Sequence, residues 1–322
     1  MSSPFISVVI PVRDRAATLE RAIESVLTQT VPPGEVIVVD DGSEDGSAAV
    51  AEGFGPPVRV LRQPPTGVYA ARNRGIEASR GELIAFLDSD DVWLPMRLEC
   101  ELPLLEDPSV GLVFGNGRVV DRRKGKRRRL PPSLFLITPP RRGDLARHLV
   151  WGNCIPTGSV LVRRECFERT GPFRTTARLS ADYAKWMEIA LNYRIDFVEG
   201  PVFEYVIHEN NISADVETSL EARLGLFEAM ARERTGAGER ELLEHLCFNL
   251  RIHRVISAVR RRSVRLVGSR LAELARSAPH CGVAFWWSVQ WIFNQARIRI
   301  LRRLSGGKAE PSPAGSIMGE TR

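Results

Sequence analysis

The chain has few cysteines, and their spacing matches neither a disulfide scaffold nor a zinc site. No CxxC pair occurs in the 322 residues, and the five cysteines are Cys100, Cys154, Cys166, Cys247 and Cys281. An odd, scattered set excludes a small stapled domain and the usual structural zinc spacings. A chain of this length buries a sufficient core without such staples. We therefore expect a reducing, cytoplasmic compartment.

Long apolar runs are also missing from the sequence. No uncharged apolar stretch reaches 18 residues, so we expect no ordinary membrane-spanning helix. Residues 1–4 carry no basic side chain, and the apolar run that begins at Phe5 ends at Pro11. This start lacks the basic and apolar regions of a secretory leader, so we expect none.

Positive charge is concentrated in two regions of the chain. The net charge is only +6, yet residues 122–129 hold seven basic residues in eight. Residues 240–304 hold thirteen arginines against three acidic residues. Such regions attract phosphate-bearing partners, for example an anionic membrane surface or a charged substrate. We expect no nucleic-acid binding, because no recognised module or aromatic stacking platform accompanies the charge.

The first ninety residues alternate short β-rich runs with segments of helical spacing, as in α/β proteins. Helices are expected between these strands and over Pro95–Glu106. The expected strands are Phe5–Ile10, Glu35–Asp40, Val58–Gln63 and Glu82–Asp88. This alternation predicts an α/β fold with a mainly parallel sheet and helices on both of its faces.

The rest of the chain changes from mixed structure to helices. Three further strands are expected at Val110–Val120, Ile155–Val162 and Phe197–Ile207, with a helix over Asp182–Asn192. Strand signals then end, and three helices are expected over 217–234, 239–262 and 264–277. Residues 305–322 are rich in Gly, Pro and Ser, so we expect a disordered tail.

Polar residues follow three of the expected parallel strands. These segments are Pro11–Asp14, Asp40–Ser43 and Asp88–Asp91. In open α/β sheets ligands bind beyond the carboxyl ends of the strands. The sequence therefore predicts that these segments meet at one edge of the sheet and form a site.

The segment from Asp88 to Asp91 places three carboxylates beside a buried strand. Such a concentration of negative charge is costly unless a cation offsets it, and carboxylate oxygens suit Mg²⁺ or Mn²⁺. A turn that caps the following helix is the alternative. For Asp41 the alternatives are a tight turn and a hydrogen bond to a nucleobase or ribose.

Three other residues have a structural and a functional interpretation. Arg72 either reaches a phosphate or lies on a solvated helical face. Asp182 precedes an expected helix, so it is either a helix cap or a general base. A lone histidine such as His208 is usually structural, although it too could belong to a site.

Taken together, these segments resemble the family 2 glycosyltransferases of the GT-A fold. The similarity covers about residues 5–213. The matching stretches, in order, are VVIPVRDRAATLERAIESVLTQT, VIVVDDGSEDGS, GVYAARNRGIEASRGELIAFLDSDDVW, GNCIPTGSVLVRRECFERTGPF with SADYAKWMEIAL, and IHENNIS. Each stretch is degenerate alone, and the ordered set carries the resemblance.

The resemblance implies a role for individual residues. Asp182 matches the family's catalytic base, and Asp90 matches the residue that binds the divalent metal, with Asp88 and Asp91 close to it. Asp41 matches the aspartate that contacts the base of the nucleotide. The residues implied to bind the nucleotide sugar are Pro11, Val12, Asp14, Asp41, Arg72, Asp88, His208 and Ser213.

Two positions depart from the family pattern. The family usually has Asn after the Pro-x of the first strand, and here Arg13 and Asp14 follow. The base is usually preceded by Glu, and here Ala181 stands in that position. The second departure bears on acceptor geometry.

The resemblance implies an inverting, metal-dependent transferase that uses Mg²⁺ or Mn²⁺. It would move a sugar from a nucleoside-diphosphate sugar, with UDP favoured, to a saccharide or lipid-linked acceptor in cell-surface glycan synthesis. The expected organisation is a catalytic domain over 1–213, a helical region over 214–304 that could support a homodimer, and the tail. Residues 281–304 combine tryptophans with arginines, which suits a helix at a membrane interface or a packed helix.

Two other functions are weighed against this one. A haloacid-dehalogenase-type phosphatase needs its DxD after the first strand and a later GDxxxD-like motif, and neither condition holds. A catalytically impaired nucleotide-binding scaffold at the membrane is the alternative that Ala181 leaves open. The presence of Asp88, Asp90 and Asp182 favours the enzyme.

Overall fold

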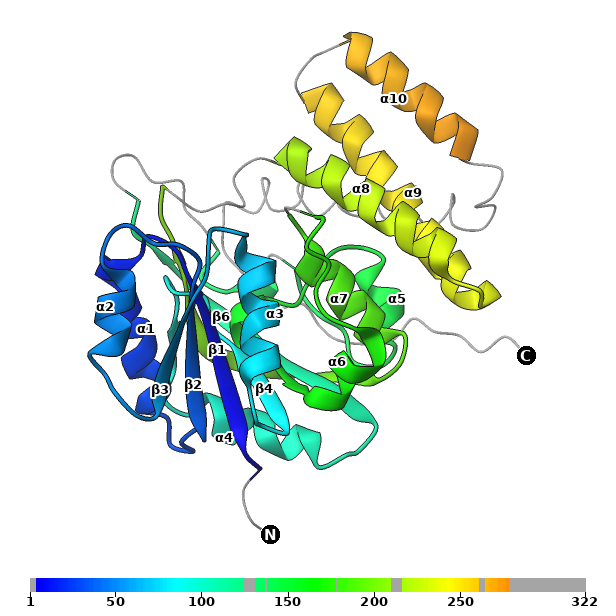
Figure 1. Cartoon of the computed structure of the whole chain (residues 1–322). Helices are drawn as coiled ribbons and strands as arrows, with labels where there is room; N and C mark the ends of the chain where they lie inside the picture. Colours follow the sequence, from blue (N-terminus) through cyan, green and yellow to red (C-terminus); the bar gives the residue numbers. More distant parts are fainter. Residues whose placement is uncertain are drawn as a thin grey trace.

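The computed structural model describes residues 4–123, 131–136, 138–177, 179–209, 216–260 and 264–277, arranged around one central sheet (Figure 1). The strands of this sheet are β1 (Ile6–Val12), β2 (Glu35–Asp40), β3 (Val58–Arg62), β4 (Leu83–Phe86), β5 (Val92–Trp93), β6 (Val110–Asp121), β7 (Leu161–Arg163) and β8 (Arg194–Ile207).

The sheet is mixed, with the order β3-β2-β1-β4-β7-β6-β8-β5. The amino-terminal part is wholly parallel, because β1 pairs in parallel with β2 and β4, and β2 pairs in parallel with β3. The short strand β7 runs antiparallel to both β4 and β6, whereas β6 and β8 are parallel. The predicted α/β class is confirmed, and antiparallel pairing enters only after β4.

Helices cover both faces of the sheet, as predicted. One buried cluster joins alternate residues of β1 and β2 to α1, α2 and α4, and another lies on the opposite face with α5, α6 and α7. These helices are α1 (Ala16–Leu27), α2 (Ser47–Glu52), α3 (Val68–Ala78), α4 (Arg97–Glu101), α5 (Leu145–Leu149), α6 (Arg164–Thr170) and α7 (Ala181–Ala190). Because side chains alternate across a strand, buried strands supply both clusters at once.

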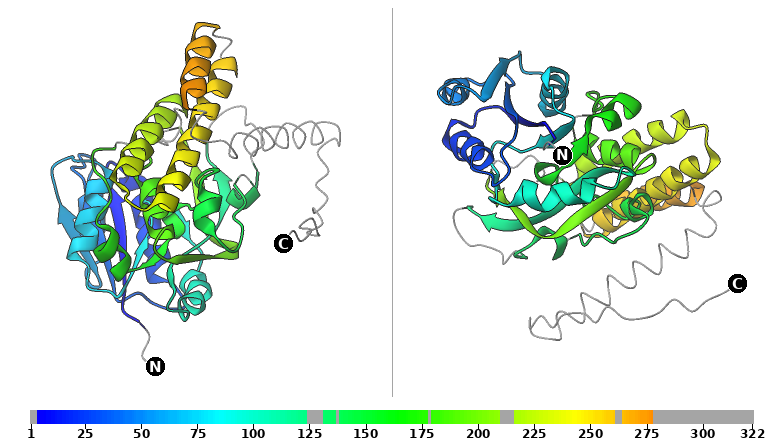
Figure 2. Two further views of the ribbon diagram at one scale, coloured as in Figure 1. Left: turned by 90° about the vertical axis from the view of Figure 1, so that its right-hand side faces the viewer. Right: turned by 90° about the horizontal axis from the view of Figure 1, so that it is seen from below.

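Three helices follow the sheet: α8 (Val216–Glu233), α9 (Ala237–Arg260) and α10 (Val264–Ser277). They lie beside α7 rather than against the parallel strands (Figures 1 and 2). Leu224 and Phe227 of α8 belong to the cluster that contains α7, and the ring of Phe227 lies 4.8 Å from that of Tyr183. Arg223 Nε also donates to Ser180 Oγ at 2.8 Å. The helical region therefore shares a core with the sheet.

Arginines of the basic carboxyl-terminal region pair with glutamates of neighbouring helices. Arg254 contacts Glu221 at 3.0 Å and Glu273 at 2.6 Å, and Arg270 contacts the same two glutamates. The ion pairs of these two arginines thus link α8, α9 and α10, so their charge is already engaged within the protein. None of the described helices is both long and apolar enough to span a bilayer.

Two expected elements differ from the structure. The strand expected over Ile155–Val162 is a 3-10 turn at Thr157–Ser159 followed by β7, because Ser159 N and Val160 N donate to Pro156 O and Thr157 O within the turn. The helix expected from Pro95 begins at Arg97 and continues as a 3-10 turn over Leu102–Leu105. Residues 305–322 lie outside the described part of the chain.

A buried ion pair lies beneath the carboxyl end of β4. Arg97 and Glu101 have fully buried side chains, and their closest charged atoms are 3.1 Å apart. The Arg97 guanidinium carbon lies 3.8 Å from the centroid of the Trp93 ring. Burial raises the pKa of Glu101 to about 7, although Arg97 acts in the opposite direction. The pair is therefore costly to bury and depends on further hydrogen bonds.

Backbone carbonyls supply those hydrogen bonds to Arg97. Its Nη1 donates to Gly158 O at 2.8 Å and to Phe86 O at 3.3 Å, and its Nη2 donates to Val160 O at 2.9 Å. One guanidinium thus joins α4 to the end of β4 and to the turn before β7.

The variant Arg97→Met should lower the free energy of unfolding by about 3–5 kcal/mol, because Glu101 would stay buried without its partner. Urea denaturation measures this change. The double variant Arg97→Met/Glu101→Leu should recover part of the loss. A single variant that loses less than about 1 kcal/mol would show that the pair does not hold these segments together.

Candidate active site

The three polar segments meet at the carboxyl edge of the parallel strands, as predicted. Pro11 and Val12 are the last residues of β1 and are buried. Asp41 N donates to Val12 O at 2.8 Å, and Asp14 N donates to Ser43 Oγ at 3.0 Å. The ends of β1 and β2 are therefore joined directly.

The backbone of Asp14 explains one departure from the family pattern. Asp14 has φ +51°, a left-handed conformation that Asn and Asp adopt more readily than other non-glycine residues. Its Oδ1 accepts from Glu44 N at 2.8 Å. Asp at this position is therefore compatible with the left-handed backbone of the turn.

Asp41 is 3% exposed and is surrounded by donors from the loop before α3. Its Oδ1 accepts from Gln63 Nε2 at 2.7 Å and from Thr66 N at 2.8 Å, and its Oδ2 accepts from Gly67 N at 2.8 Å. Asp41 thus holds this loop in place. Its direct contact with a nucleobase stays a prediction.

Arg72 and Asp88 form a close ion pair. Arg72 Nη2 lies 2.5 Å from Asp88 Oδ1, and the exposed fractions of the two side chains are 6% and 34%. Arg72 lies on α3, which approaches β1 closely: a Cβ placed on Gly75 would lie 2.3 Å from Val9 Cγ1. The solvated-face alternative for Arg72 is therefore wrong, since its guanidinium points into the site.

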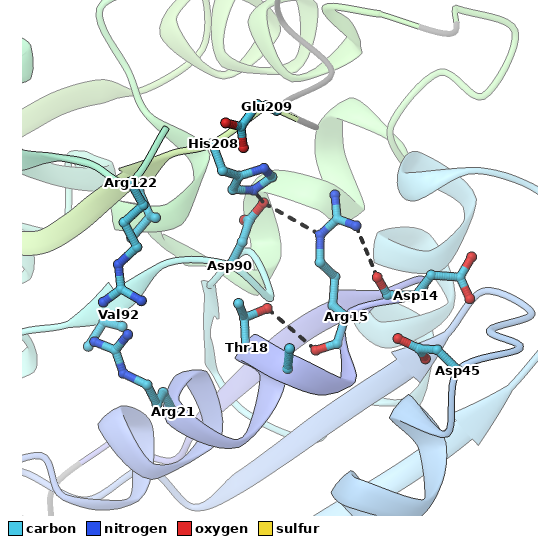
Figure 3. Close-up of a pocket in the computed structure, with 12 residues that line it drawn as sticks. Asp14, Arg15, Thr18, Arg21, Asp45, Asp90, Val92, Arg122, His208 and Glu209 are labelled. Carbon is cyan, nitrogen blue, oxygen red and sulfur yellow. Dashed lines mark hydrogen bonds and ion pairs between the residues drawn. The ribbon is translucent and has the colours of Figure 1, made fainter. Parts of the chain in front are cut away.

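Asp90 and His208 face each other across the end of the sheet (Figure 3). Asp90 Oδ2 lies 2.8 Å from His208 Nε2 and 3.8 Å from Arg15 Nε. Both side chains border a cavity of about 280 Å³. The other residues that line it are Asp14, Arg15, Ala17, Thr18, Arg21, Asp45, Val92, Arg122, Val206 and Glu209.

Asp91 has a different environment from Asp90. It is 3% exposed, and its Oδ1 accepts from Val206 N at 2.8 Å. Burial, followed by the charges of Asp88 and Asp90, raises the pKa of Asp91 well above its ordinary value. In this geometry the side chain of Asp91 joins β8 to the acidic turn, which we define as Asp88–Asp91. A role of Asp91 in metal binding stays a prediction.

Asp182 lies in the first turn of α7 and receives two hydroxyl donors. Tyr69 Oη is 3.2 Å from Asp182 Oδ1, and Thr157 Oγ1 is 3.2 Å from Asp182 Oδ2. The N-cap position of this helix is occupied by Ser180 and not by Asp182. Ala181 is 1% exposed and packs in the large core, so the position of the family's usual Glu points into the protein here.

Some predicted features lie outside the described residues. These are Ser213, most of the basic run at 122–129 and the tryptophan-rich segment at 281–304. Arg122 is described, and its exposed side chain lines the cavity.

Three residues of the site were not anticipated from the sequence: Arg15, Tyr69 and Thr157. Tyr69 and Thr157 lie within stretches that carry the family resemblance, and Arg15 directly follows Asp14. Their spacing along the chain gives no sign of these contacts, which join residues 25 to 113 positions apart.

The family model "Glycosyl transferase family 2" matches residues 7–171, half of the chain. The chain belongs to this family. The matched segment contains the acidic turn and Arg72 but ends before Asp182. The predicted resemblance is thereby confirmed.

Several curated relatives are 24–35% identical to this chain over the aligned residues. An uncharacterized protein from Mycobacterium tuberculosis is 35% identical, with 61% of this chain and 65% of the relative aligned. An uncharacterized glycosyltransferase from Rickettsia felis is 26% identical over 72% of this chain and 39% of the relative. The chain thus spans less than two thirds of the length of either relative.

Solved structures confirm the GT-A fold. TarS 1-349 from S. aureus, in complex with UDP-GlcNAc, superposes with a TM-score of 0.65 at 17% identity, covering 85% of this chain and 81% of that one. The mannosyltransferase PcManGT from Pyrobaculum calidifontis, in complex with GDP-Man and Mn²⁺, gives 0.58 at 19% identity, covering 92% and 83%. At these identities the likeness concerns the fold alone.

The variant Asp41→Asn should lower the free energy of unfolding by about 1–2 kcal/mol, because the buried amide places an N–H group against a part-buried backbone donor and that donor loses its acceptor. Urea denaturation checks this. Glu52→Gln, which alters an exposed ion pair with Arg62, is the control and should change little. Equal stability of Asp41→Asn and wild type would contradict the anchoring role of Asp41.

Proposed function

We propose that the protein is an inverting, metal-dependent glycosyltransferase that moves a sugar from a nucleoside-diphosphate sugar to an acceptor hydroxyl. One observation carries the proposal. Tyr69 and Arg72 lie three positions apart on α3, and they contact Asp182 and Asp88 respectively. A single rigid helix thus sets the separation between the acidic turn and the proposed base.

The donor is proposed to lie along the carboxyl edge of β1, β2 and β4. Its nucleoside lies near Pro11, Val12 and Asp41, with Asp88 and Arg72 toward the ribose and phosphates. UDP is favoured by the family resemblance, and the complexes of TarS with UDP-GlcNAc and of PcManGT with GDP-Man keep both bases in the test below.

The described residues fit an open metal site. Within them no group of three or more His, Cys, Asp or Glu side chains is arranged to hold an ion. Asp90 and His208 nevertheless present an oxygen and a nitrogen 2.8 Å apart. Mg²⁺ and Mn²⁺ favour carboxylate oxygens, and Mg²⁺ is commonly held by one or two carboxylates together with substrate phosphates. Asp90, with His208 and Asp88 beside it, would hold the ion, and the ion would neutralise charge on the diphosphate.

The cavity beside Asp90 is proposed to receive the diphosphate. Arg15, Arg21 and Arg122 line it from the loop before α1, from α1 and from the end of β6 (Figure 3). Guanidinium groups aimed at a leaving group stabilise the charge that develops on it. Arg15 lies 3.8 Å from Asp90, which supports a role for its guanidinium beside the diphosphate.

The chemistry assigned to Asp182 is general-base catalysis. Its carboxylate accepts the proton of the acceptor hydroxyl while that oxygen bonds to the anomeric carbon. The bond from this carbon to the diphosphate oxygen breaks, and its electron pair leaves with the diphosphate. One in-line displacement inverts the configuration, and no covalent enzyme intermediate is required.

The acceptor is proposed to be a saccharide or lipid-linked saccharide used in cell-surface glycan synthesis, reached at the cytoplasmic membrane face. The alternative, an inactive nucleotide-binding scaffold, remains tied to Ala181. The buried position of Ala181 weighs against it, because the contacts of Asp182 do not depend on that side chain.

Thermal unfolding with UDP, GDP, dTDP and CDP, each with and without Mn²⁺, tests the donor site. One nucleotide should raise the melting temperature in a metal-dependent manner, by mass action. Asp90→Asn should remove the dependence on Mn²⁺. Asp107→Asn, an exposed carboxylate paired with Arg194, should retain it. Absence of any shift at saturating nucleotide would contradict a donor site.

The variant Asp182→Asn should abolish sugar transfer, by about 10²–10⁴-fold, because an amide accepts no proton from the acceptor. Nucleotide binding in the thermal assay should stay close to that of wild type. Wild-type transfer by this variant would remove Asp182 as the base.

A further inference from the structure

Both oxygens of Asp182 are engaged by hydroxyl groups that the sequence places far away. Tyr69 comes from α3 and Thr157 from the turn before β7, each at 3.2 Å from its own carboxylate oxygen. A carboxylate oxygen accepts two hydrogen bonds, so each retains capacity for one more. Because the two donors come from different elements, they fix both the position and the plane of the carboxylate.

Tyr69 is held rigidly where it meets Asp182. It is 9% exposed, and its ring stacks on that of Phe173 with centroids 6.0 Å apart. The guanidinium carbon of Arg72 lies 5.5 Å from the centroid of the same Tyr69 ring. Burial, followed by the charge of Asp182, raises the pKa of Tyr69. The phenol therefore stays protonated at neutral pH and donates to the carboxylate.

Thr157 is fixed by the buried Arg97 network. It is 7% exposed and precedes Gly158, whose carbonyl accepts from Arg97 Nη1 at 2.8 Å and from Trp93 Nε1 at 3.0 Å. Arg97 therefore holds both the turn that carries the Thr157 hydroxyl and the end of β4. The hydrogen bond of each hydroxyl goes to Asp182, not to a strand of the sheet.

We propose that Tyr69 and Thr157 are positioning residues for the base of this enzyme, which act by aiming the carboxylate of Asp182 at the acceptor hydroxyl. The proposal rests on the proposed function. Because a misplacement of about 1 Å costs roughly 10²-fold in rate, loss of either donor should lower kcat while donor binding is kept.

The test uses the full chain with Mn²⁺ and measures nucleoside-diphosphate release from UDP-glucose, UDP-N-acetylglucosamine and GDP-mannose, with water as the acceptor. Tyr69→Phe and Thr157→Val should each lower kcat by roughly ten- to hundredfold, without change in the donor KM. Thr157→Ser retains a hydroxyl and should restore most of kcat.

Tyr183→Phe is the matched control. Tyr183 is a buried tyrosine of α7 whose hydroxyl donates to Leu149 O and not to Asp182. Its loss should lower the melting temperature and leave kcat unchanged. The comparison separates a buried hydroxyl that stabilises the fold from one that aims the base.

Three outcomes decide the inference. Wild-type kcat in Tyr69→Phe and Thr157→Val, with Asp182→Asn inactive, would overturn it and leave the proposed function standing. A parallel loss of kcat, donor binding and melting temperature would also overturn it, in favour of a purely structural role. Full activity of Asp182→Asn would instead contradict the proposed function.

Discussion

The candidate site depends on one buried guanidinium. Arg97 satisfies carbonyls at the end of β4 and in the turn before β7, while Glu101 balances its charge. The carbonyls that it binds include Phe86 O, two residues before Asp88, and Gly158 O, next to Thr157. A charge that is expensive to bury is tolerated here because Glu101 and three backbone carbonyls satisfy the guanidinium, and those carbonyls join α4 to the end of β4 and to the turn before β7.

The amino-terminal strands could be predicted because their chemistry is local. Runs such as Glu35–Asp40 are apolar and bounded by turn residues, and the structure has this strand at the same bounds. The strand predicted over Ile155–Val162 was wrong because the structure of this segment depends on contacts that are distant in the sequence. Its residues are mostly apolar, but Thr157–Ser159 form a 3-10 turn, and the hydrogen bond from Arg97 to Gly158 O, which supports this turn, joins residues far apart in the sequence.

For the site, the sequence located the motifs but not their pairings. Asp88, Asp90 and Asp91 are adjacent in the chain, yet they face Arg72, His208 and the backbone of Val206 respectively. Which of them turns to the surface is decided by tertiary contacts. The arginine-rich carboxyl region shows the same limit, since charge counts do not reveal that Arg254 and Arg270 share partners across helices.

The hydrogen bond from Arg223 to Ser180 gives α8 access to the proposed chemistry. Ser180 adopts φ +66° immediately before the turn that carries Asp182, so α8 contacts the residue at which this turn begins. The segment that the family model matches, residues 7–171, supplies the two hydroxyls on the same carboxylate, from Tyr69 and Thr157. The proposed base therefore lies between one support inside the matched segment and one outside it, so a substitution in α8 is expected to move Asp182 relative to Tyr69 and Thr157.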